Sequence, residues 1–366
     1  MGDAAPLHAP TSTWSTVPST QLPDGEASKM VSLALDRLMG YLQKLEHAAE
    51  KGSVPHALAA EAQTAYVTFC KELNDVIGDA SRLSEKQRVE LGIFVSERLS
   101  PYVALAASAN RWRSKPRGYA GDDVSIQMIY DGYPAGDASF AQTIDSLFLA
   151  MPAAQAVRTR RQILASRIET TYNVATGRRP VRIMAMAAGP AAELFDAWNN
   201  LGCPSDLHAY LVDGDPAAVE ALQQRSTLLM ANGAQTSTKL CVAARKASLA
   251  HVALGRIKLD APMQDVVYSL GLSDYLKDNL VVKLLDVAYG LLYPGGVVIV
   301  GNFHESNPDK ACLDHVIQWK LIHRTEDDMH RLMKASRFGT GCEEILRDAT
   351  GIQMLAIGRK PFESSL

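Results

Sequence analysis

The sequence predicts an α/β fold in which a doubly wound, mostly parallel sheet follows an N-terminal unit of helices. Apolar residues recur in three- and four-residue steps from Met30 to about Asn110, which is typical of amphipathic helices. After Arg179-Pro180, short apolar runs alternate with helix-length segments, as in strands joined by crossover helices. The 366 residues, 47% of them hydrophobic, are enough for two structural units with large cores.

Composition excludes several classes of protein. The 37 Lys and Arg nearly balance the 40 Asp and Glu, so the chain lacks the basic footprint of a nucleic-acid-binding protein. No apolar stretch approaches the roughly 18 residues of a membrane span. Five cysteines are an odd number and form no CxxC pair, which predicts neither a disulfide framework nor a zinc knuckle. We therefore expect a cytoplasmic protein that acts on small molecules.

Three regions follow along the chain. Residues 1–28 are rich in Ser, Thr, Pro and Ala, have no secretory signal pattern, and are expected to form a disordered tail. Residues 29–140 are expected to form a helical cap. Its third helix starts at Ser84, because Gln87 stands three residues later in a capping-box spacing. Residues 141–366 are expected to form the sheet domain.

A polar stretch lies near the end of the cap, from Asn110 to about Ser139. It is rich in Arg, Gly, Tyr, Asp and Pro, and it does not show the spacing of a buried core. Loops held on a rigid scaffold often carry function. We therefore expect this stretch to be a functional loop, after which helical spacing returns from Ser139 to Thr170.

Five short apolar runs are candidate strands of the sheet. In open sheets of parallel strands, ligands bind at the carboxyl ends of the strands. We therefore expect the binding site where these runs end. The runs are 181–186, 207–212, 239–242, 265–270 and 296–301.

Two features at strand ends point to a nucleoside ligand. The turn Ala187-Ala188-Gly189 brings backbone amides and a helix N-terminus to the ligand with little side chain in the way. Asp213 ends the second strand, where a carboxylate can accept both hydroxyls of a ribose. The G-x-G-x-x-G pattern of Rossmann dehydrogenases is absent. Alanine tolerates a positive φ less well than glycine, so we expect a turn of somewhat different shape.

Further segments follow in a fixed order: 245–248 after the third strand, 265–276 across the fourth, and 291–300, with a Pro-Gly-Gly turn, before the fifth. Together these features resemble class I S-adenosylmethionine-dependent methyltransferases over about residues 180–305. The resemblance implies a seven-stranded Rossmann-like sheet, S-adenosylmethionine as cofactor, and methyl transfer in small-molecule biosynthesis.

A closer resemblance extends over residues 110–330. It is carried by the segments 115–122, 152–158, 271–276, 301–304 and 319–324. These are similar to a bacterial group labelled 3-hydroxypalmitic acid methyl ester biosynthesis proteins, which implies a small or lipid-like acceptor methylated on a carboxylate. Two alternatives stay open: an N- or O-methyltransferase acting on a natural-product scaffold, and a non-catalytic protein that binds S-adenosylmethionine. A homodimer is also left open.

The resemblance and the strand ends together nominate cofactor-binding residues. The ring of Tyr119, on the polar loop, is expected to face the sulfonium, and Arg161 is expected to pair with the methionine carboxylate. Ser269 and Gly271 lie at the end of the fourth strand. The full set is Tyr119, Asp122, Arg161, Ala187, Gly189, Asp213, Ala247, Ser248, Ser269 and Gly271.

Residues for the acceptor and for catalysis complete the hypothesis. His304 is the candidate base or acceptor-orienting group, since its pKa suits either task. Arg113 and Arg117 could clamp an acidic acceptor, with Tyr275 and Asn302 as further contacts. A carboxylate acceptor needs no base because it is ionised at neutral pH, whereas a hydroxyl or an amine would gain from one. The histidines show no metal-ligand spacing, and we expect no metal.

Overall fold

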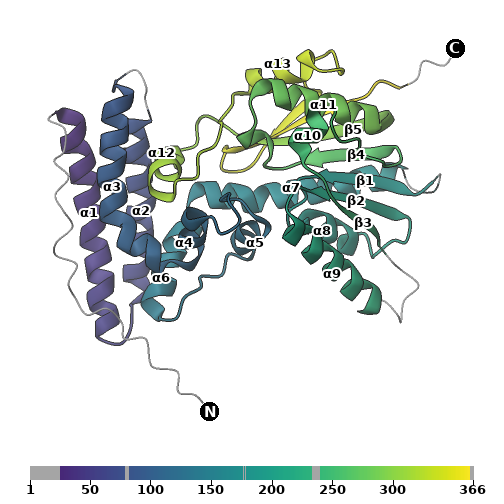
Figure 1. Cartoon of the computed structure of the whole chain (residues 1–366). Coiled ribbons are helices and arrows are strands. Elements are labelled where there is room, and N and C mark those ends of the chain that lie inside the picture. Colours follow the sequence, from purple (N-terminus) through teal and green to yellow (C-terminus); the bar gives the residue numbers. More distant parts are fainter. Residues whose placement is uncertain (1–24, 79–81, 176, 178, 233–239, 363–366) are drawn as a thin grey trace.

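The computed structural model describes residues 25–78, 82–175, 177, 179–232 and 240–362. Helices gather at one end of the molecule and a twisted sheet lies at the other (Figure 1). The expected tail falls outside the described residues as far as residue 24. The prediction was wrong for residues 26–28, because the first helix already begins at Glu26 and Ser28 is buried.

Seven helices precede the first strand in the described chain. The first three pack side by side (Figure 1), and the third begins with the predicted capping box, in which Gln87 N donates to Ser84 Oγ. The helices are α1 (Glu26–Glu50), α2 (His56–Ile77), α3 (Glu85–Leu105), α4 (Ala107–Ser114), α5 (Asp123–Asp131), α6 (Ser139–Leu149) and α7 (Pro152–Ala175).

The polar stretch after Asn110 is not a single loop, contrary to expectation. Helix α4 extends to Ser114, and α5 begins after Asp122, whose carboxylate accepts from Ser125 N as an N-cap. Gly132 ends α5 in a left-handed conformation with φ 66°. Two shorter segments, 115–122 and 132–138, are non-helical. The local capping residues therefore divide the stretch.

The helical core also takes in residues from the second half of the chain. α12 (Lys310–Cys312) and a π-helical segment (Leu313–Ile317) pack with α2 and α3, as Figure 1 shows for α12. Ile317, Trp319 and Val157 belong to the same buried cluster as the first helices. The expected boundary between residues 140 and 141 stays a prediction, and the two regions share one continuous core.

Replacing Gly92 by alanine is expected to lower the free energy of unfolding by about 1–3 kcal/mol, the usual cost of overpacking. Gly92 is buried on α3, and a Cβ there would lie 2.0 Å from Nδ1 of His315. Gly40→Ala is the control: it is also a helix-interior change, but its Cβ meets nothing within 4 Å. Urea unfolding should show the control stabilised by up to about 1 kcal/mol. Equal effects at both glycines would contradict the prediction.

The sheet has seven strands in the order β3-β2-β1-β4-β5-β7-β6. β1, β2, β3, β4 and β5 are parallel, whereas β7 pairs antiparallel with both β5 and β6. The predicted doubly wound, Rossmann-like fold is therefore confirmed. The strands are β1 (Val181–Met186), β2 (Leu207–Asp213), β3 (Cys241–Lys246), β4 (Gln264–Ser269), β5 (Leu292–Phe303), β6 (Glu344–Arg347) and β7 (Gln353–Arg359).

Helices cover both faces of the sheet. Leu164 of α7 and Phe195 of α8 belong to the buried cluster on one face, while Leu285 of α11 and Leu332 of α13 belong to the cluster on the other. The remaining helices are α8 (Ala192–Asn200), α9 (Pro216–Asn232), α10 (Leu249–Ala253), α11 (Asp278–Leu291) and α13 (Glu326–Ala335).

Strand ends differ in places from those predicted. The third run began at Lys239, which lies outside the described residues, and the strand runs instead from Cys241 to Lys246. The fifth extends in both directions from the predicted 296–301. The seven strands agree with the sheet that the resemblance implies, but the positions of β6 and β7 were not predicted. The five cysteines are free, and no helix in the described ranges is long and apolar enough to cross a bilayer.

Candidate active site

A cavity of about 630 Å³ opens at the carboxyl ends of the parallel strands. It lies where the chain order reverses, since β2 flanks β1 on one side and β4 flanks it on the other. Such a reversal is the usual ligand site of doubly wound sheets. Its lining comes from the ends of β1, β2 and β4, from the start of α10, from α7, and from the segment 117–123.

The turn after β1 is built from left-handed residues. Ala187 has φ 60°, Gly189 φ 50° and Ala191 φ 47°. Alanine in this conformation costs about 1–2 kcal/mol relative to the right-handed one, and such strain gathers at functional sites. A Cβ built on Gly189 would meet nothing within 4 Å, so the cavity is open above this residue. The two alanines thus adopt the conformation that glycine usually supplies.

Asp213 ends β2 at the wall of the cavity and is only 8% exposed. Its Oδ2 accepts from Gly189 N at 2.9 Å, and its Oδ1 accepts from Asp215 N at 2.9 Å. Each carboxylate oxygen can accept two hydrogen bonds, so capacity for a ligand remains. The two backbone contacts fix the carboxylate and join the turns after β1 and β2.

The segment 115–122 lies against the rim through Asp215. Arg117 Nη1 donates to Asp215 Oδ2 at 3.0 Å and also pairs with Asp123, and Tyr119 Oη donates to Asp215 Oδ2 at 3.3 Å. Partial burial opposes ionisation of Asp215, but hydrogen bonds from Ala217 N and Arg117 lower its pKa overall. Arg117 and Tyr119 line the cavity as expected, yet Arg117 is engaged by two aspartates.

Of the two neighbouring arginines on α7, Arg160 lines the cavity and Arg161 does not. Arg161 forms a two-pronged ion pair with Asp196 at 2.6 and 2.8 Å and lies over the ring of Tyr130, so the structure does not bring this predicted cofactor ligand to the cavity. Arg160 lines the cavity and is 5% exposed. A signal for it was present, because Arg160 follows Val157 by three residues and precedes Leu164 by four, on the buried face of α7.

Two buried acids that the sequence did not reveal also line the cavity. Glu193 Oε1 accepts from Tyr268 Oη at 2.9 Å, and burial raises the pKa of Glu193. Asp274 Oδ1 accepts from Phe303 N at 2.8 Å, and burial raises its pKa to about 6. A tyrosine inside an apolar strand needs a polar partner, so Tyr268 was a usable signal for such a group.

Replacing Asp274 by asparagine is expected to remove a pH dependence of stability. The folded-state pKa of about 6 exceeds the ordinary value of 3.8, so ionisation favours the unfolded chain and stability falls as pH rises from about 4 to 6. Across that window the variant should gain up to about 3 kcal/mol relative to the parent, at 1.36 kcal/mol per pKa unit. Urea unfolding at pH 4, 5.5 and 7 measures this, and parallel profiles would contradict it.

Three predicted site residues lie outside the cavity lining, contrary to expectation. Asp122 caps α5 and is paired with Arg111. Asn302 is buried in contacts with Ser273 and with main-chain carbonyls. His304 lies outside the cavity lining, with its Nδ1 2.7 Å from Ser306 Oγ, and burial lowers its pKa. The hydrogen bonds of Asp122 and Asn302 engage their side-chain polar atoms, and those of His304 engage its Nδ1.

The remaining predicted residues divide between the cavity and its surroundings. Ala187, Gly189, Ser248, Gly271 and Tyr275 line the cavity. Ala247 and Ser269 are buried beside it without lining it, and Ser269 Oγ has no hydrogen-bond partner.

Arg113 lines a separate cavity of about 690 Å³ that shares Tyr119, Tyr275 and Trp319 with the first. Trp319 Nε1 donates to Tyr275 Oη at 2.6 Å between the two cavities. Among the described residues, no group of three or more His, Cys, Asp or Glu side chains comes together to hold a metal.

No protein-family model matches the sequence, and no curated protein matches it. Solved structures do match by fold. A possible exported protein from Bordetella parapertussis has a TM-score of 0.52 at 15% identity, over 92% of this chain and 97% of that one. The apo S-adenosylmethionine-dependent methyltransferase SibL has a TM-score of 0.43 at 18% identity, over 92% and 100%. Magnesium protoporphyrin IX methyltransferase from Synechocystis PCC 6803 has a TM-score of 0.42 at 11% identity, over 69% and 97%. The match to the Bordetella protein supports the fold, and the chain has a doubly wound Rossmann-like fold extended by N-terminal helices.

Proposed function

We propose that the protein transfers a methyl group from S-adenosylmethionine to a small or lipid-like acceptor. One observation carries the proposal: the carboxylate of Asp213 is fixed at the end of β2, in a cavity at the point where the strand order reverses. A carboxylate there is suited to the two hydroxyls of a ribose. The sequence resemblance to class I methyltransferases, with its strand-end motifs, supports the same conclusion.

The residues around Asp213 fit an adenosyl ligand. The open space above Gly189 admits a close approach to the backbone of the turn. Leu249, Ala250 and Leu272 give the cavity apolar wall beyond the ends of the strands, which suits a purine. The bound cofactor would supply an activated methyl group on a sulfonium, so the chain has to align the acceptor and exclude water. Such alignment contributes roughly 7–11 kcal/mol in well-oriented reactions.

The other side of the cavity supports an apolar acceptor. Val157, Phe303 and Leu321 line it there, together with Trp319. His304, the base favoured by the sequence, lies outside the cavity, and a carboxylate acceptor, which is ionised at neutral pH, would not need it. We therefore propose a carboxylate acceptor and a methyl ester product. The segment 115–122, tied to Asp215, would shield the reacting atoms from water.

Calorimetry with S-adenosylmethionine and its demethylated product S-adenosylhomocysteine tests the donor half. Both are expected to bind, and failure of both would remove the proposal. The acceptor half is tested with a panel that pairs each fatty or aromatic acid with the corresponding alcohol and amine, by following methyl transfer from labelled S-adenosylmethionine. Ester formation supports the carboxylate. Methylation confined to alcohols or amines would replace it with an O- or N-methyltransferase.

A further inference from the structure

Arg160 is a buried cation with an unused hydrogen-bond donor. It is 5% exposed, its Nη1 donates to Gln353 Oε1 at 3.2 Å, and its Nε is buried without a hydrogen-bond partner in the described structure. No carboxylate forms an ion pair with it among the described residues. A buried guanidinium is costly to leave unpaired, and the missing partner is an anion.

The position of Arg160 places this side chain at the cavity. The residue lines the cavity from α7, and both Nη atoms lie 3.4 Å from where a Cβ on Gly271 would stand, at the end of β4. Gln353, which accepts from Arg160 Nη1, begins β7, on the far side of β5 from β4. In the sheet, β4 lies two strands from β2, which ends at Asp213, and adjacent strands are about 4.8 Å apart, so this hydrogen-bond donor stands along the sheet from the ribose position.

The charged groups described around Arg160 do not accept a hydrogen bond from its Nε. Glu193 accepts from Tyr268, and Asp274 accepts from Phe303 N, so each buried acid has a partner of its own. Tyr130 is buried nearby, where burial raises its pKa, and the charge of Arg160 and a hydrogen bond with it oppose that rise. The guanidinium is therefore surrounded by groups that stabilise a cation without supplying the side-on carboxylate that arginine binds best.

We propose that Arg160 is the carboxylate receptor of this cavity, binding a ligand carboxylate through its free edge. The inference rests on the proposed function and names a second ligand group, beyond the ribose at Asp213. Two molecules could provide that carboxylate: the methyl donor S-adenosylmethionine, through its methionine half, or the methyl acceptor. The chemistry is the same in both cases, and the binding experiment separates them.

The test compares Arg160→Met and Arg160→Lys with the parent chain by calorimetry. Arg161→Met is the matched control, because it removes the neighbouring guanidinium of the same helix, which binds Asp196 outside the cavity. The methyl-donor probes are S-adenosylhomocysteine and 5′-methylthioadenosine, which share adenosine and a thioether, whereas only the first carries an amino-acid group with its carboxylate and ammonium. The acceptor probes are octanoate and benzoate with their primary amides, titrated into the complex with S-adenosylhomocysteine.

If the carboxylate belongs to the methyl donor, Arg160→Met should weaken the binding of S-adenosylhomocysteine by about 10- to 100-fold and leave the binding of 5′-methylthioadenosine unchanged. If it is the acceptor's, the variant should bind S-adenosylhomocysteine normally and lose the acids but not the amides. Arg160→Lys should retain part of the affinity, and Arg161→Met nearly all of it. The difference between paired probes does not depend on the folded fraction of a variant.

Two results would overturn the proposal: unchanged binding of every probe, or equal weakening of both donor probes, which would mean a purely structural role. Failure of both donor probes to bind the parent chain would instead refute the proposed function. In that case octanoate and benzoate, titrated into the parent and Arg160→Met without a donor probe, still decide whether Arg160 binds a carboxylate.

Discussion

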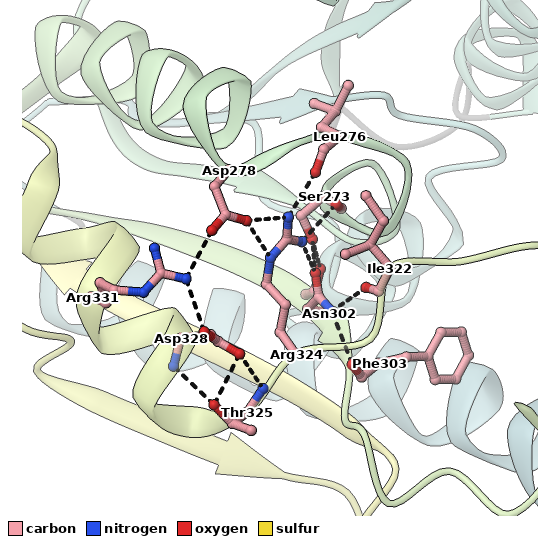
Figure 2. Close-up of polar contacts among 11 residues, drawn as sticks. Ser273, Leu276, Asp278, Asn302, Phe303, Ile322, Arg324, Thr325, Asp328 and Arg331 are labelled. Carbon is pink, nitrogen blue, oxygen red and sulfur yellow. Dashed lines mark hydrogen bonds and ion pairs between the residues drawn. The ribbon is translucent and has the colours of Figure 1, made fainter. Parts of the chain in front are cut away.

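Replacing Arg324 by methionine is expected to lower the free energy of unfolding by about 3–5 kcal/mol, the cost of removing one member of a buried charged network. Arg324 is 2% exposed and sits at the centre of the contacts in Figure 2. Its Nη1 donates to Ser273 O at 2.8 Å and to Asn302 Oδ1 at 2.7 Å. Its Nη2 donates to Leu276 O at 2.7 Å and to Asp278 Oδ1 at 2.9 Å.

The effect is large because several buried acceptors lose a charged donor together. Methionine fills part of the space but donates no hydrogen bond. Leu276 O would lose its donor, while Ser273 O would keep only Leu276 N and Asn302 Oδ1 only Ser273 Oγ. Each unsatisfied buried group costs about 1–3 kcal/mol. The network also holds the segment 273–276, part of which lines the cavity, against the end of β5. The loss should therefore reach the site as well as the fold.

Arg331→Met is the control for this prediction. Arg331 Nη2 donates to the same Asp278 at 2.8 Å, but its side chain is 56% exposed, and exposed ion pairs contribute at most about 1 kcal/mol. Urea unfolding followed by circular dichroism measures both variants. Equal midpoints would contradict the view that burial, and not the charge pair with Asp278, makes Arg324 important.

Replacing Asp213 by asparagine is expected to weaken the binding of S-adenosylmethionine by about 1–2 kcal/mol, or about 5- to 30-fold. The substitution removes the charge that would accept the ribose hydroxyls while keeping the size of the side chain. It also puts an NH₂ group where one oxygen now accepts a backbone N–H from Gly189 or Asp215. Because that exchange disturbs the turn after β1, Asp213→Asn should also be less stable than the parent.

Calorimetry on folded protein separates affinity from stability. Asp196→Asn serves as the control, since Asp196 is an acid at the ion pair with Arg161, outside the cavity lining. It should leave S-adenosylmethionine affinity within twofold of the parent, taken as about the limit of measurement. If Asp213→Asn binds the donor as tightly as the parent does, the ribose role of Asp213 is refuted.

The sequence identified the fold because its signals are local. Val181–Met186 is apolar except for Arg182, as is typical of a strand buried on both faces, and the capping box at Ser84 is set by residues three apart. Ala187 directly follows the first strand and Asp213 ends the second, so their positions could be predicted from the strand ends, and both line the cavity as expected. β6 could not be located from the sequence because it is a four-residue edge strand that is not buried at any position.

Site residues that depend on distant partners could not be assigned this way. Arg161 and Arg160 are neighbours in sequence, but consecutive helix residues point about 100° apart. Arg161 therefore pairs with Asp196, whereas Arg160 lines the cavity. Asn302 and His304 lie at the end of a central strand, as a ligand residue would, yet Asn302 contacts Ser273 and Nδ1 of His304 contacts Ser306. The sequence by itself determined which segments become strands and where they end. The tertiary structure alone decided which polar atoms stay unpaired at those ends, because hydrogen bonds between residues far apart in the chain exist only after it has folded.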